Sequence, residues 1–407
     1  MKILLVNKFH YVKGGSETYY FGLADLLKKQ GHEVIFFSMK DEKNVPCEQE
    51  KYFVENVDFN QKMNPVKLVK ASLKMLYSLE AKKKFEQLLI DEKPDIIHLN
   101  IFQSQLTGSI VDVAYKYHIP MVYTAHDLKS VCPNYQMLNH GDICEKCING
   151  NYTYCAKTGC MKDSKLKSIL ATLEAYVYKR RRTYQKLDLI ITPSAFYKRK
   201  IEEAGIAKCP VIHMTNFLPE GTEYSVSEKP GEYFLYFGRI SREKGILTLV
   251  RAYAEAKVKK PLYIVGTGPI EGQVCQLIEE LHMSDKIKML GFKSGNELKE
   301  IVANSLCVCL PSEWYENGPY SIMEAQAVGK PVIVSDNGGL PELVKNGVTG
   351  YIVKSKNIED LTEKLQNCEK TNDWKYEILK EVSEKKYSGD NYAIWITKRY
   401  SEILHKK

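Results

Sequence analysis

Two glutamates, Glu316 and Glu324, have a spacing and a context that suggest chemistry. The apolar run 306–310 precedes them and predicts a buried strand. Gly318-Pro319 then predicts the start of a helix, because proline is pre-organised for the first helical position. Gly329 ends the predicted helix. Glu316 is therefore expected in the loop, and Glu324 more than one turn into the helix.

The start of this helix provides free backbone N–H groups between the two carboxylates. Such a helix start binds anions, and phosphate above all. A carboxylate repels phosphate but accepts hydrogen bonds from hydroxyls, so the arrangement suits a ligand with phosphates and a hydroxyl-rich group at each end. A nucleoside diphosphate sugar has this form. The spacing alone fits a buried strand–helix corner with solvated acids equally well, and both interpretations stay open.

A basic loop, Gly238 to Gly245, follows an expected strand at 233–238. Its Arg239 and Lys244 are expected to face the same crevice as the Glu316 helix. Arginine offers a planar fork to phosphate oxygens and lysine a point charge, so both are suited to a departing diphosphate. Considered alone, the loop is better explained as a solvated basic turn. No Asp-x-Asp occurs in the chain, which favours a site where these cations, and not a bound metal, stabilise the diphosphate.

Glycine turns follow other expected strands. Gly14-Gly15 follows the first apolar run, 2–7, at the carboxyl end where open α/β sheets bind ligands. Gly266 and Gly268 follow the run 261–266 in the same way. Glycine lets a ligand approach the backbone closely, although a plain strand–helix turn is an equally good explanation.

Strands and helices alternate along nearly the whole chain. This alternation predicts an α/β protein with parallel sheets and right-handed crossovers. At 407 residues we expect two doubly wound, Rossmann-like domains facing a cleft. Their expected limits are 1–220, with an insert at about 128–164, and 221–385, with a linker at 221–231 and a final segment, 386–407. The expected strands are 2–7, 33–39, 94–100, 120–127, 187–192, 210–217, 233–238, 261–266, 286–291, 306–310 and 331–335; one long helical region is expected at 63–92.

Composition indicates a globular protein, with 44% hydrophobic and 27% charged residues. No apolar run approaches the roughly 18 residues of a membrane span, and residues 1–6 are better explained as a strand than as a signal peptide. We therefore expect a cytoplasmic protein.

The net charge is +8. Basic runs at 82–84, 179–182 and 198–200 are best explained as solvated faces, the sharper alternative being peripheral contact with the inner face of an anionic membrane. No recognition module for nucleic acid is found.

A cysteine-rich insert interrupts the α/β pattern between Asp127 and about Ser164. Four thiolates in two pairs match structural zinc, and a loop this long without periodicity gains folding energy from a metal. We favour zinc over free thiols; Cys132 or His140 is an alternative ligand, and an iron–sulfur cluster is less favoured. The predicted ligands are Cys144, Cys147, Cys155 and Cys160.

Together these motifs resemble the retaining, two-domain glycosyltransferases of the group 1, or family 4, type. The resemblance rests on the E-x7-E pair, on Asn317-Gly318-Pro319, on 329–333, on the G-R-x4-K-G loop, on Gly266-x-Gly268-Pro269 and on Thr124–Asp127. It covers most of the chain, and the cysteine-rich insert departs from the basic pattern of the family. The resemblance implies the two-domain architecture named GT-B, a retaining mechanism and a final helix that crosses back to the first domain.

The resemblance also implies roles for individual residues. Catalytic roles fall to His126, Arg239, Lys244 and Glu316, with Glu316 and His126 holding the donor sugar. Glu324 holds the ribose. The residues implied in donor binding are Gly15, Gly238, Gly266, Gly268, Asn317, Gly318, Pro319, Tyr320 and Glu324.

The implied reaction moves a sugar, such as a hexose, from a nucleotide donor to a hydroxyl of a glycan or lipid-linked acceptor in bacterial polysaccharide synthesis. No cofactor is implied for catalysis. Two alternatives stay open. A sugar-nucleotide epimerase should carry further acid/base carboxylates, which we do not find. A non-enzymatic subunit of a polysaccharide-assembly complex would typically lack one of the four charged residues Arg239, Lys244, Glu316 and Glu324, and all are present.

Overall fold

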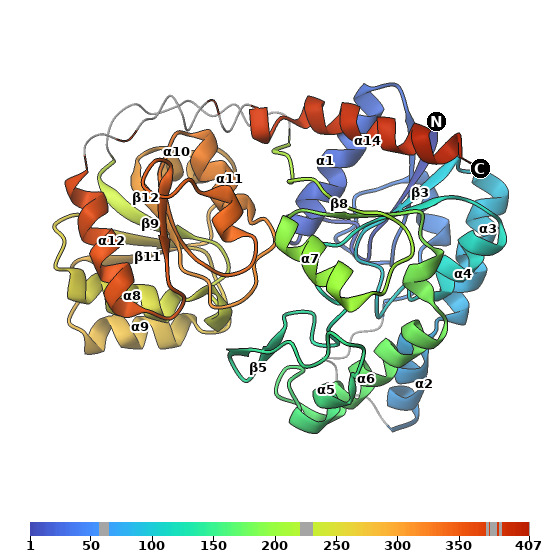
Figure 1. Ribbon diagram of the computed structural model, residues 1–407, viewed down its shortest axis with the longest axis horizontal. Coiled ribbons are helices and arrows are strands. Elements are labelled where there is room, and N and C mark those ends of the chain that lie inside the picture. The colour runs from blue at the N-terminus through green and yellow to red at the C-terminus, as the bar shows by residue number, and fades with distance from the viewer. Residues whose placement is uncertain (57–64, 220–230, 372–373, 375–380, 382–384, 407) are drawn as a thin grey trace. The chain divides into compact units, whose positions relative to one another are not determined.

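A computed structural model describes residues 1–56, 65–219, 231–371, 374, 381 and 385–406 (Figure 1). The expected linker at 221–231 lies, except for its last residue, outside the described residues. The chain divides into two compact units. The first unit comprises Met1–His140, Cys144–Pro219 and Gly389–Lys407, and the second Gly141–Ile143 and Glu220–Ser388.

The first unit is built on a six-stranded parallel sheet of order β2-β1-β3-β4-β7-β8. Its register begins with Ile3 opposite both Val34 and Ile96. Because the strand order reverses between β1 and β3, a crevice forms at their carboxyl ends, where ligands bind in open α/β sheets. The strands are β1 (Lys2–Val6), β2 (Glu33–Phe37), β3 (Ile96–Leu99), β4 (Met121–Thr124), β7 (Leu189–Thr192) and β8 (Val211–His213).

The first unit also contains helices, the last of which follows the second unit in the chain. They are α1 (Gly15–Lys29), α2 (Pro65–Leu76), α3 (Leu79–Glu92), α4 (Ser109–Lys116), α7 (Ala195–Ala204) and α14 (Gly389–Leu404), with the 3-10 turns η1 (Glu48–Tyr52) and η2 (Thr183–Lys186). The helical region expected at 63–92 consists of two helices, α2 and α3, and its first two residues lie outside the described residues. Ser78 adopts an extended backbone, and its hydroxyl accepts a hydrogen bond from Ala81 N, which starts a new helix at α3.

The insert forms a small substructure of its own. It contains the two-residue strands β5 (Leu138–Asn139) and β6 (Asp142–Ile143) and the short helix α5 (Thr153–Thr158). The longer helix α6 (Lys165–Arg180) follows and leads back to the sheet. Cys147, Tyr152 and Cys155 form a small buried cluster against α6. The substructure therefore has a hydrophobic centre, smaller than that of the sheet it leaves.

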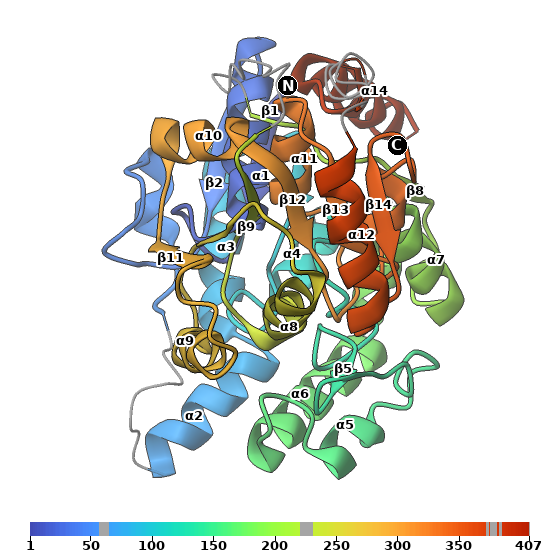
Figure 2. The ribbon, with the colours of Figure 1, turned by 90° about the vertical axis from the view of Figure 1, so that its left-hand side faces the viewer.

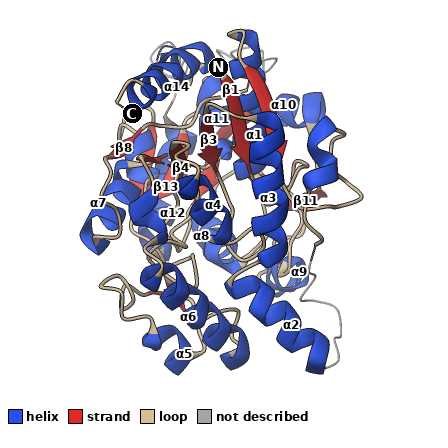
Figure 3. Cartoon of the chain, turned by 90° about the vertical axis from the view of Figure 1, so that its right-hand side faces the viewer, coloured by secondary structure: helices blue, strands red, loops and turns tan. Residues whose placement is uncertain are grey.

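The last helix, α14, packs against α1 in the first unit (Figures 1 and 3). Two of its tyrosines enter the core through their hydroxyls. Tyr400 is hydrogen-bonded to His98 Nδ1, and Tyr392 lies 2.6 Å from the hydroxyl of Tyr19. Thr124 joins these pairs, since its Oγ1 lies 2.7 Å from His98 Nε2 and 3.2 Å from the Tyr19 hydroxyl. The chain thus returns to complete the polar interior of its first unit.

The second unit repeats the architecture. Its six parallel strands have the order β11-β10-β9-β12-β13-β14. Helices α8, α9 and α12 cover one face of the sheet, and α10 and α11 lie on the other (Figures 1 and 2). The strands are β9 (Tyr233–Phe237), β10 (Leu262–Val265), β11 (Ile287–Gly291), β12 (Ser305–Leu310), β13 (Val332–Ser335) and β14 (Gly350–Val353). The helices and 3-10 turns are η3 (Arg242–Lys244), α8 (Ile246–Ala256), α9 (Glu271–Glu280), α10 (Gly295–Ala303), α11 (Tyr320–Ala327), η4 (Leu340–Leu343) and α12 (Ile358–Lys370).

The predicted fold class, two doubly wound α/β domains, is confirmed. Sequence analysis missed β14, whose Gly350 has a φ of +153°. A side chain there would place its Cβ 2.0 Å from the carbonyl oxygen of Val332 on β13. Gly350 weakens the sequence pattern expected of a strand, because glycine is rare in strands. The same glycine is required for the pairing of β14 with β13.

Candidate active site

Glu316 lies at the centre of a charged cluster in the loop between β12 and α11. Its Oε1 accepts hydrogen bonds from Ser312 Oγ at 2.7 Å and from Trp314 Nε1 at 2.8 Å. Lys244 Nζ, from η3, lies 2.6 Å from the same oxygen. The side chains of Glu316 and Lys244 are only 6% and 19% exposed. Three donors on one oxygen fix the carboxylate in place and offset the cost of burying the ion pair.

Two glycines let the surrounding loops approach this cluster. Gly338 has a φ of +64°, and a Cβ there would lie 2.3 Å from the carbonyl oxygen of Glu316. The next residue, Gly339, donates its N–H to that oxygen at 2.7 Å. Gly245 has a φ of +70°, and its Cβ would lie 1.9 Å from the carbonyl oxygen of Pro311. Both loops therefore need glycine to place Lys244 and Glu316 together.

The pair Gly338-Gly339, in sequence a plain glycine turn before Leu340-Pro341, was not among the predicted site residues. The structure gives the turn a different role, because it packs on the backbone of Glu316, and it is followed by a single 3-10 turn, η4. Ser312 and Trp314 were also missed as partners of Glu316. Their closeness in sequence to Glu316 was the one available signal.

Glu324 lies on α11, in the second turn of the helix. Burial raises the pKa of its carboxyl to about 7, and the charge of Lys299 opposes this in part. The group therefore changes its ionisation near neutral pH. The expected proline position was wrong by one residue. Pro319 caps the helix with an extended ψ of 130°, and its carbonyl accepts from Ile322 N, so Tyr320 is the first helical residue.

The loops after β9 and β10 pack backbone against backbone. A Cβ on Gly266 would lie 1.9 Å from the carbonyl oxygen of Gly238, and one on Gly268 would lie 2.1 Å from that of Ile240. The glycines are thus required by the packing of the two loops. Arg239 between them is exposed, and no hydrogen bond or ion pair of its side chain is found among the residues that the structure describes. The structure brings Lys244, but not the Arg239 side chain, to Glu316.

Asn317 and Gly318 continue the loop from Glu316 to the start of α11. Asn317 is 9% exposed. Pro319 and Tyr320 follow at the helix start. The structure therefore brings together the predicted residues between Glu316 and Glu324 on one strand–loop–helix unit.

His126 lies in the first unit, just after β4. Its Nε2 is 2.9 Å from Asn100 Oδ1, and its ring centre is 4.8 Å from that of Tyr19. Burial lowers the pKa of His126 to about 3, so the ring is neutral at pH 7. Because an amide oxygen only accepts, the neutral ring carries its proton on Nε2. Sequence analysis missed Asn100, which follows β3 and orients this histidine.

Gly15 is the first residue of α1. Its neighbour Gly14 has an extended backbone with a φ of −171°, which any residue can adopt. A Cβ at Gly14 would meet only Glu17 Oε2, at 3.9 Å. Glu17 is itself buried and accepts from Asn7 Nδ2 at 3.1 Å. A side chain at position 14 would therefore have space around it. Backbone strain does not explain why this position is glycine.

The predicted zinc ligands lie near one another in the insert. The Cys155 thiol donates to the carbonyl of Ser168 at 3.7 Å, and burial raises the pKa of Cys147 to about 11. All cysteines are free thiols. His140, the alternative ligand, instead contacts Asp163 Oδ1 at 2.7 Å. Within the described ranges no group of three or more His, Cys, Asp or Glu side chains is arranged to hold a metal. The arrangement does not fit a closed tetrahedral site, and zinc stays a prediction.

Among the helices of the described residues, none is both long enough and apolar enough to cross a bilayer.

Two family profiles match the chain. Residues 13–217 match "Glycosyltransferase Family 4", and residues 223–387 match "Glycosyl transferases group 1". The first match covers half of the 407-residue chain, and the second lies wholly outside it.

Curated relatives include the putative colanic acid biosynthesis glycosyltransferase WcaL of Salmonella typhimurium, 28% identical over 47% of this chain and 50% of the relative. The amylovoran biosynthesis glycosyltransferase AmsK of Erwinia amylovora is 26% identical over 42% of this chain and 45% of the relative. The chain thus matches about half the length of these relatives. An uncharacterized protein of the Klebsiella pneumoniae cps region is 24% identical over 84% of this chain and 87% of the relative.

Solved structures share the fold. The sucrose-phosphate synthase of Thermosynechococcus elongatus superposes with a TM-score of 0.72 at 18% identity, over all of both chains. HepE of Anabaena, solved with UDP and glucose, gives a TM-score of 0.67 at 17% identity, over 99% of this chain and all of that one. These likenesses agree with the two profiles and with the paired parallel sheets, and the chain belongs to the family 4, group 1 glycosyltransferases of GT-B fold.

Proposed function

We propose that this protein transfers a sugar from a nucleoside diphosphate donor to a hydroxyl of a glycan or lipid-linked acceptor, with retention of configuration. The observation that carries the proposal is the Lys244–Glu316 pair beside the start of α11. A cation from η3 and a fixed carboxylate meet beside the start of a helix. Such a set can bind phosphates and sugar hydroxyls together.

Each charged group has a distinct proposed task. Lys244 and Arg239 stabilise the diphosphate as the bond to the sugar breaks, which is why no metal is needed there. Glu316 holds the sugar through its fixed carboxylate. Glu324 accepts hydrogen bonds from the ribose in its ionised form. The start of α11, from Asn317 to Tyr320, faces the phosphates. Asn317, Gly318 and Tyr320 carry backbone N–H groups there, and Pro319 carries none.

The first unit supplies the acceptor side in this proposal, and the second unit the donor side. His126 is neutral, so it holds a sugar hydroxyl by hydrogen bonding and adds no charge to the site. Gly15 lies at the carboxyl end of β1, where the sheet has its crevice. We place the domain limits at 1–220, 221–385 and 386–407.

Polysaccharide synthesis is the proposed context. WcaL and AmsK are named for colanic acid and amylovoran biosynthesis, and a further relative lies in a cps region. HepE has also been solved with UDP-glucose, which makes a hexose nucleotide the first donor to try. The epimerase and the non-enzymatic subunit remain the alternatives, although the presence of all four charged residues favours the transferase.

We place the protein in the cytoplasm, at the membrane periphery when its acceptor is lipid-linked. Leu166, Ile169 and Leu173 recur at helical spacing on α6 and are 55%, 45% and 46% exposed. The exposed Lys165 and Lys167 flank this apolar stripe. A basic, apolar helix face suits the surface of an anionic bilayer.

A thermal-shift panel tests the donor site first. UDP-, GDP-, ADP- and TDP-sugars are added with and without magnesium. Stabilisation by one base class without magnesium is expected, because binding to the folded state raises its melting temperature. No stabilisation by any donor would favour the non-enzymatic subunit.

Elemental analysis of dialysed protein tests the structural zinc in the same preparation.

A further inference from the structure

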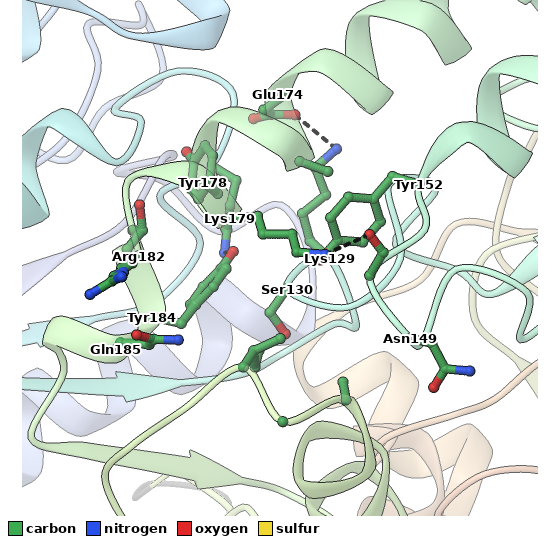
Figure 4. Close-up of a pocket in the computed structure, with 17 residues that line it drawn as sticks. Lys129, Ser130, Asn149, Tyr152, Glu174, Tyr178, Lys179, Arg182, Tyr184 and Gln185 are labelled. Atoms are coloured by element: carbon green, nitrogen blue, oxygen red, sulfur yellow. Dashed lines mark hydrogen bonds and ion pairs between the residues drawn. The ribbon is translucent and has the colours of Figure 1, made fainter.

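The first unit contains a cavity of about 130 Å³ that the proposed reaction does not use. It lies among the loop after β4, the insert, the end of α6 and the end of α7 (Figure 4). On the same measure a single water molecule needs about a tenth of this volume. The cavity therefore has room for a small organic group.

Two buried hydroxyls line this cavity without a partner. Ser130 Oγ and Thr183 Oγ1 have no hydrogen bond among the described residues, and the two residues are 4% and 1% exposed. Ser130 lies between the labelled residues of the insert and those of η2 (Figure 4). Leaving a buried hydroxyl unpaired costs about 1–3 kcal/mol. Each oxygen is itself closed off from water, so a side-chain rotation must turn it into the cavity before it can bond a polar ligand.

The charges around the cavity are unequal. Glu174 is 1% exposed and already paired, because Lys129 Nζ lies 2.9 Å away and Ser104 Oγ donates to it at 3.0 Å. Lys179 and Arg182 are exposed cations of the lining. Lys179 donates to the carbonyl of Gly150, a neutral group. For Arg182 no acidic partner is found in the described part of the chain. The cavity thus carries positive charge without a free acid to balance it.

We propose that this cavity binds one carboxylate- or phosphate-bearing sugar unit of the acceptor. Arg182 and Lys179 pair with its anionic group, and Ser130 and Thr183 bond its hydroxyls. That the ligand belongs to the acceptor rests on the proposed function. That the ligand is an anionic sugar rests on the cavity alone. It also gives the insert a task, since residues 149–152 form one wall of the site.

Binding of monosaccharides to the full chain tests this, measured by calorimetry or by saturation-transfer NMR without a nucleotide donor. The probes are D-glucuronic acid, D-glucose 6-phosphate and D-glucose. We expect at least one anionic sugar to bind at millimolar concentration, with glucose clearly weaker and with salt weakening the anion. The two anionic probes distinguish carboxylate from phosphate. Equal binding of all three sugars, or none, would overturn the proposal.

Matched variants locate the binding. Arg182→Gln should weaken the preferred anionic sugar by about five-fold, the upper end for an exposed ion pair. Arg180→Gln removes the same charge from a neighbouring exposed residue that does not line the cavity, and should change nothing. Equal losses in both variants would contradict the assignment. Ser130→Ala should weaken the same probe in a chain at least as stable as wild type, because it removes a buried hydroxyl that has no partner.

The sugar-binding experiment and the donor panel can contradict their two proposals independently. If glucuronic acid binds but no nucleotide sugar does, the transferase proposal is lost and the cavity remains a site for anionic sugars. If a nucleotide sugar binds but no anionic monosaccharide does, the transferase stands and the cavity assignment is lost.

Discussion

Two polar clusters, one in each unit, hold their groups in opposite ways. In the second unit Lys244 and Glu316 form a charged pair that is only partly enclosed. In the first unit His98, Tyr400 and Thr124 form a neutral network that is fully buried. Burial lowers the pKa of both His98 and His126 to about 3, so neither ring is charged at neutral pH.

This difference determines whether each cluster can bind a ligand or only stabilise the fold. A charged pair can exchange its partner for a charged ligand at small cost, because each group stays compensated. A buried neutral network has no such exchange and instead fixes one arrangement of helix and sheet. We therefore expect substitutions in the Lys244–Glu316 pair to affect catalysis first, and those in the network of His98, Tyr400 and Thr124 to affect stability first.

Lys244→Ala should have the largest effect. It removes the cation proposed to stabilise the departing diphosphate, so transfer should fall by about 10²–10³-fold, as on losing one oxyanion donor. Turnover is measured with the donor found in the thermal-shift panel. Arg251→Ala, which removes an exposed cation from α8, is the control and should keep full activity. Full turnover of Lys244→Ala in a folded protein would refute the phosphate role.

Gly338→Ala should follow in size. The added Cβ would lie 2.3 Å from the carbonyl oxygen of Glu316, so the loop must shift and Glu316 with it. We expect transfer to fall at least ten-fold and unfolding free energy to drop by about 1–3 kcal/mol.

Gly347→Ala is the matched control for this variant. Gly347 has a similar φ of +76°, but nothing lies within 4 Å of its Cβ position. It shares the backbone strain without the clash, and should keep its activity. Equal activity losses in both variants would show that strain, rather than displacement of Glu316, causes the effect.

Tyr400→Phe should act on stability alone. It removes the hydroxyl bonded to His98 Nδ1 and leaves a buried ring nitrogen unpaired, which costs about 1–3 kcal/mol. Denaturant unfolding of the first unit measures this loss. Tyr115→Phe, at a residue that is 56% exposed on α4, should be neutral. If both variants lost the same stability, the buried hydrogen-bond network would not be the cause of the loss.

Glu324 should give the smallest effect, through pH. Its folded pKa, raised to about 7 by burial, lies above the ordinary value of 4.5. The folded state therefore holds a proton that the unfolded state releases, and stability falls as pH rises from about 4.5 to 7. Glu324→Gln should flatten this fall in a plot of melting temperature against pH. In wild type, ribose binding should strengthen as pH rises through 7; a donor affinity independent of pH would contradict this.

Much of the fold could be predicted from the sequence, because buried parallel strands appear as short apolar runs bounded by glycine and proline. The run 306–310 and strand β12 differ by one residue. The cluster around Glu316 was harder to predict. Ser312 and Trp314 are ordinary loop residues in the sequence, and only the folded loop turns both toward one oxygen. Gly338 and Asn100 contact their partners across strands distant in sequence, which no local pattern reveals.

The return of α14 to the first unit has a consequence for synthesis on the ribosome. Tyr392 and Tyr400 complete a core whose other members precede Pro219. The second unit is therefore finished first, while the first waits with His98 and Tyr19 unpartnered until the last helix emerges. A chain cut short before Gly389 should damage the unit that was made first, and a factor that holds nascent chains would find its longest-lived target there.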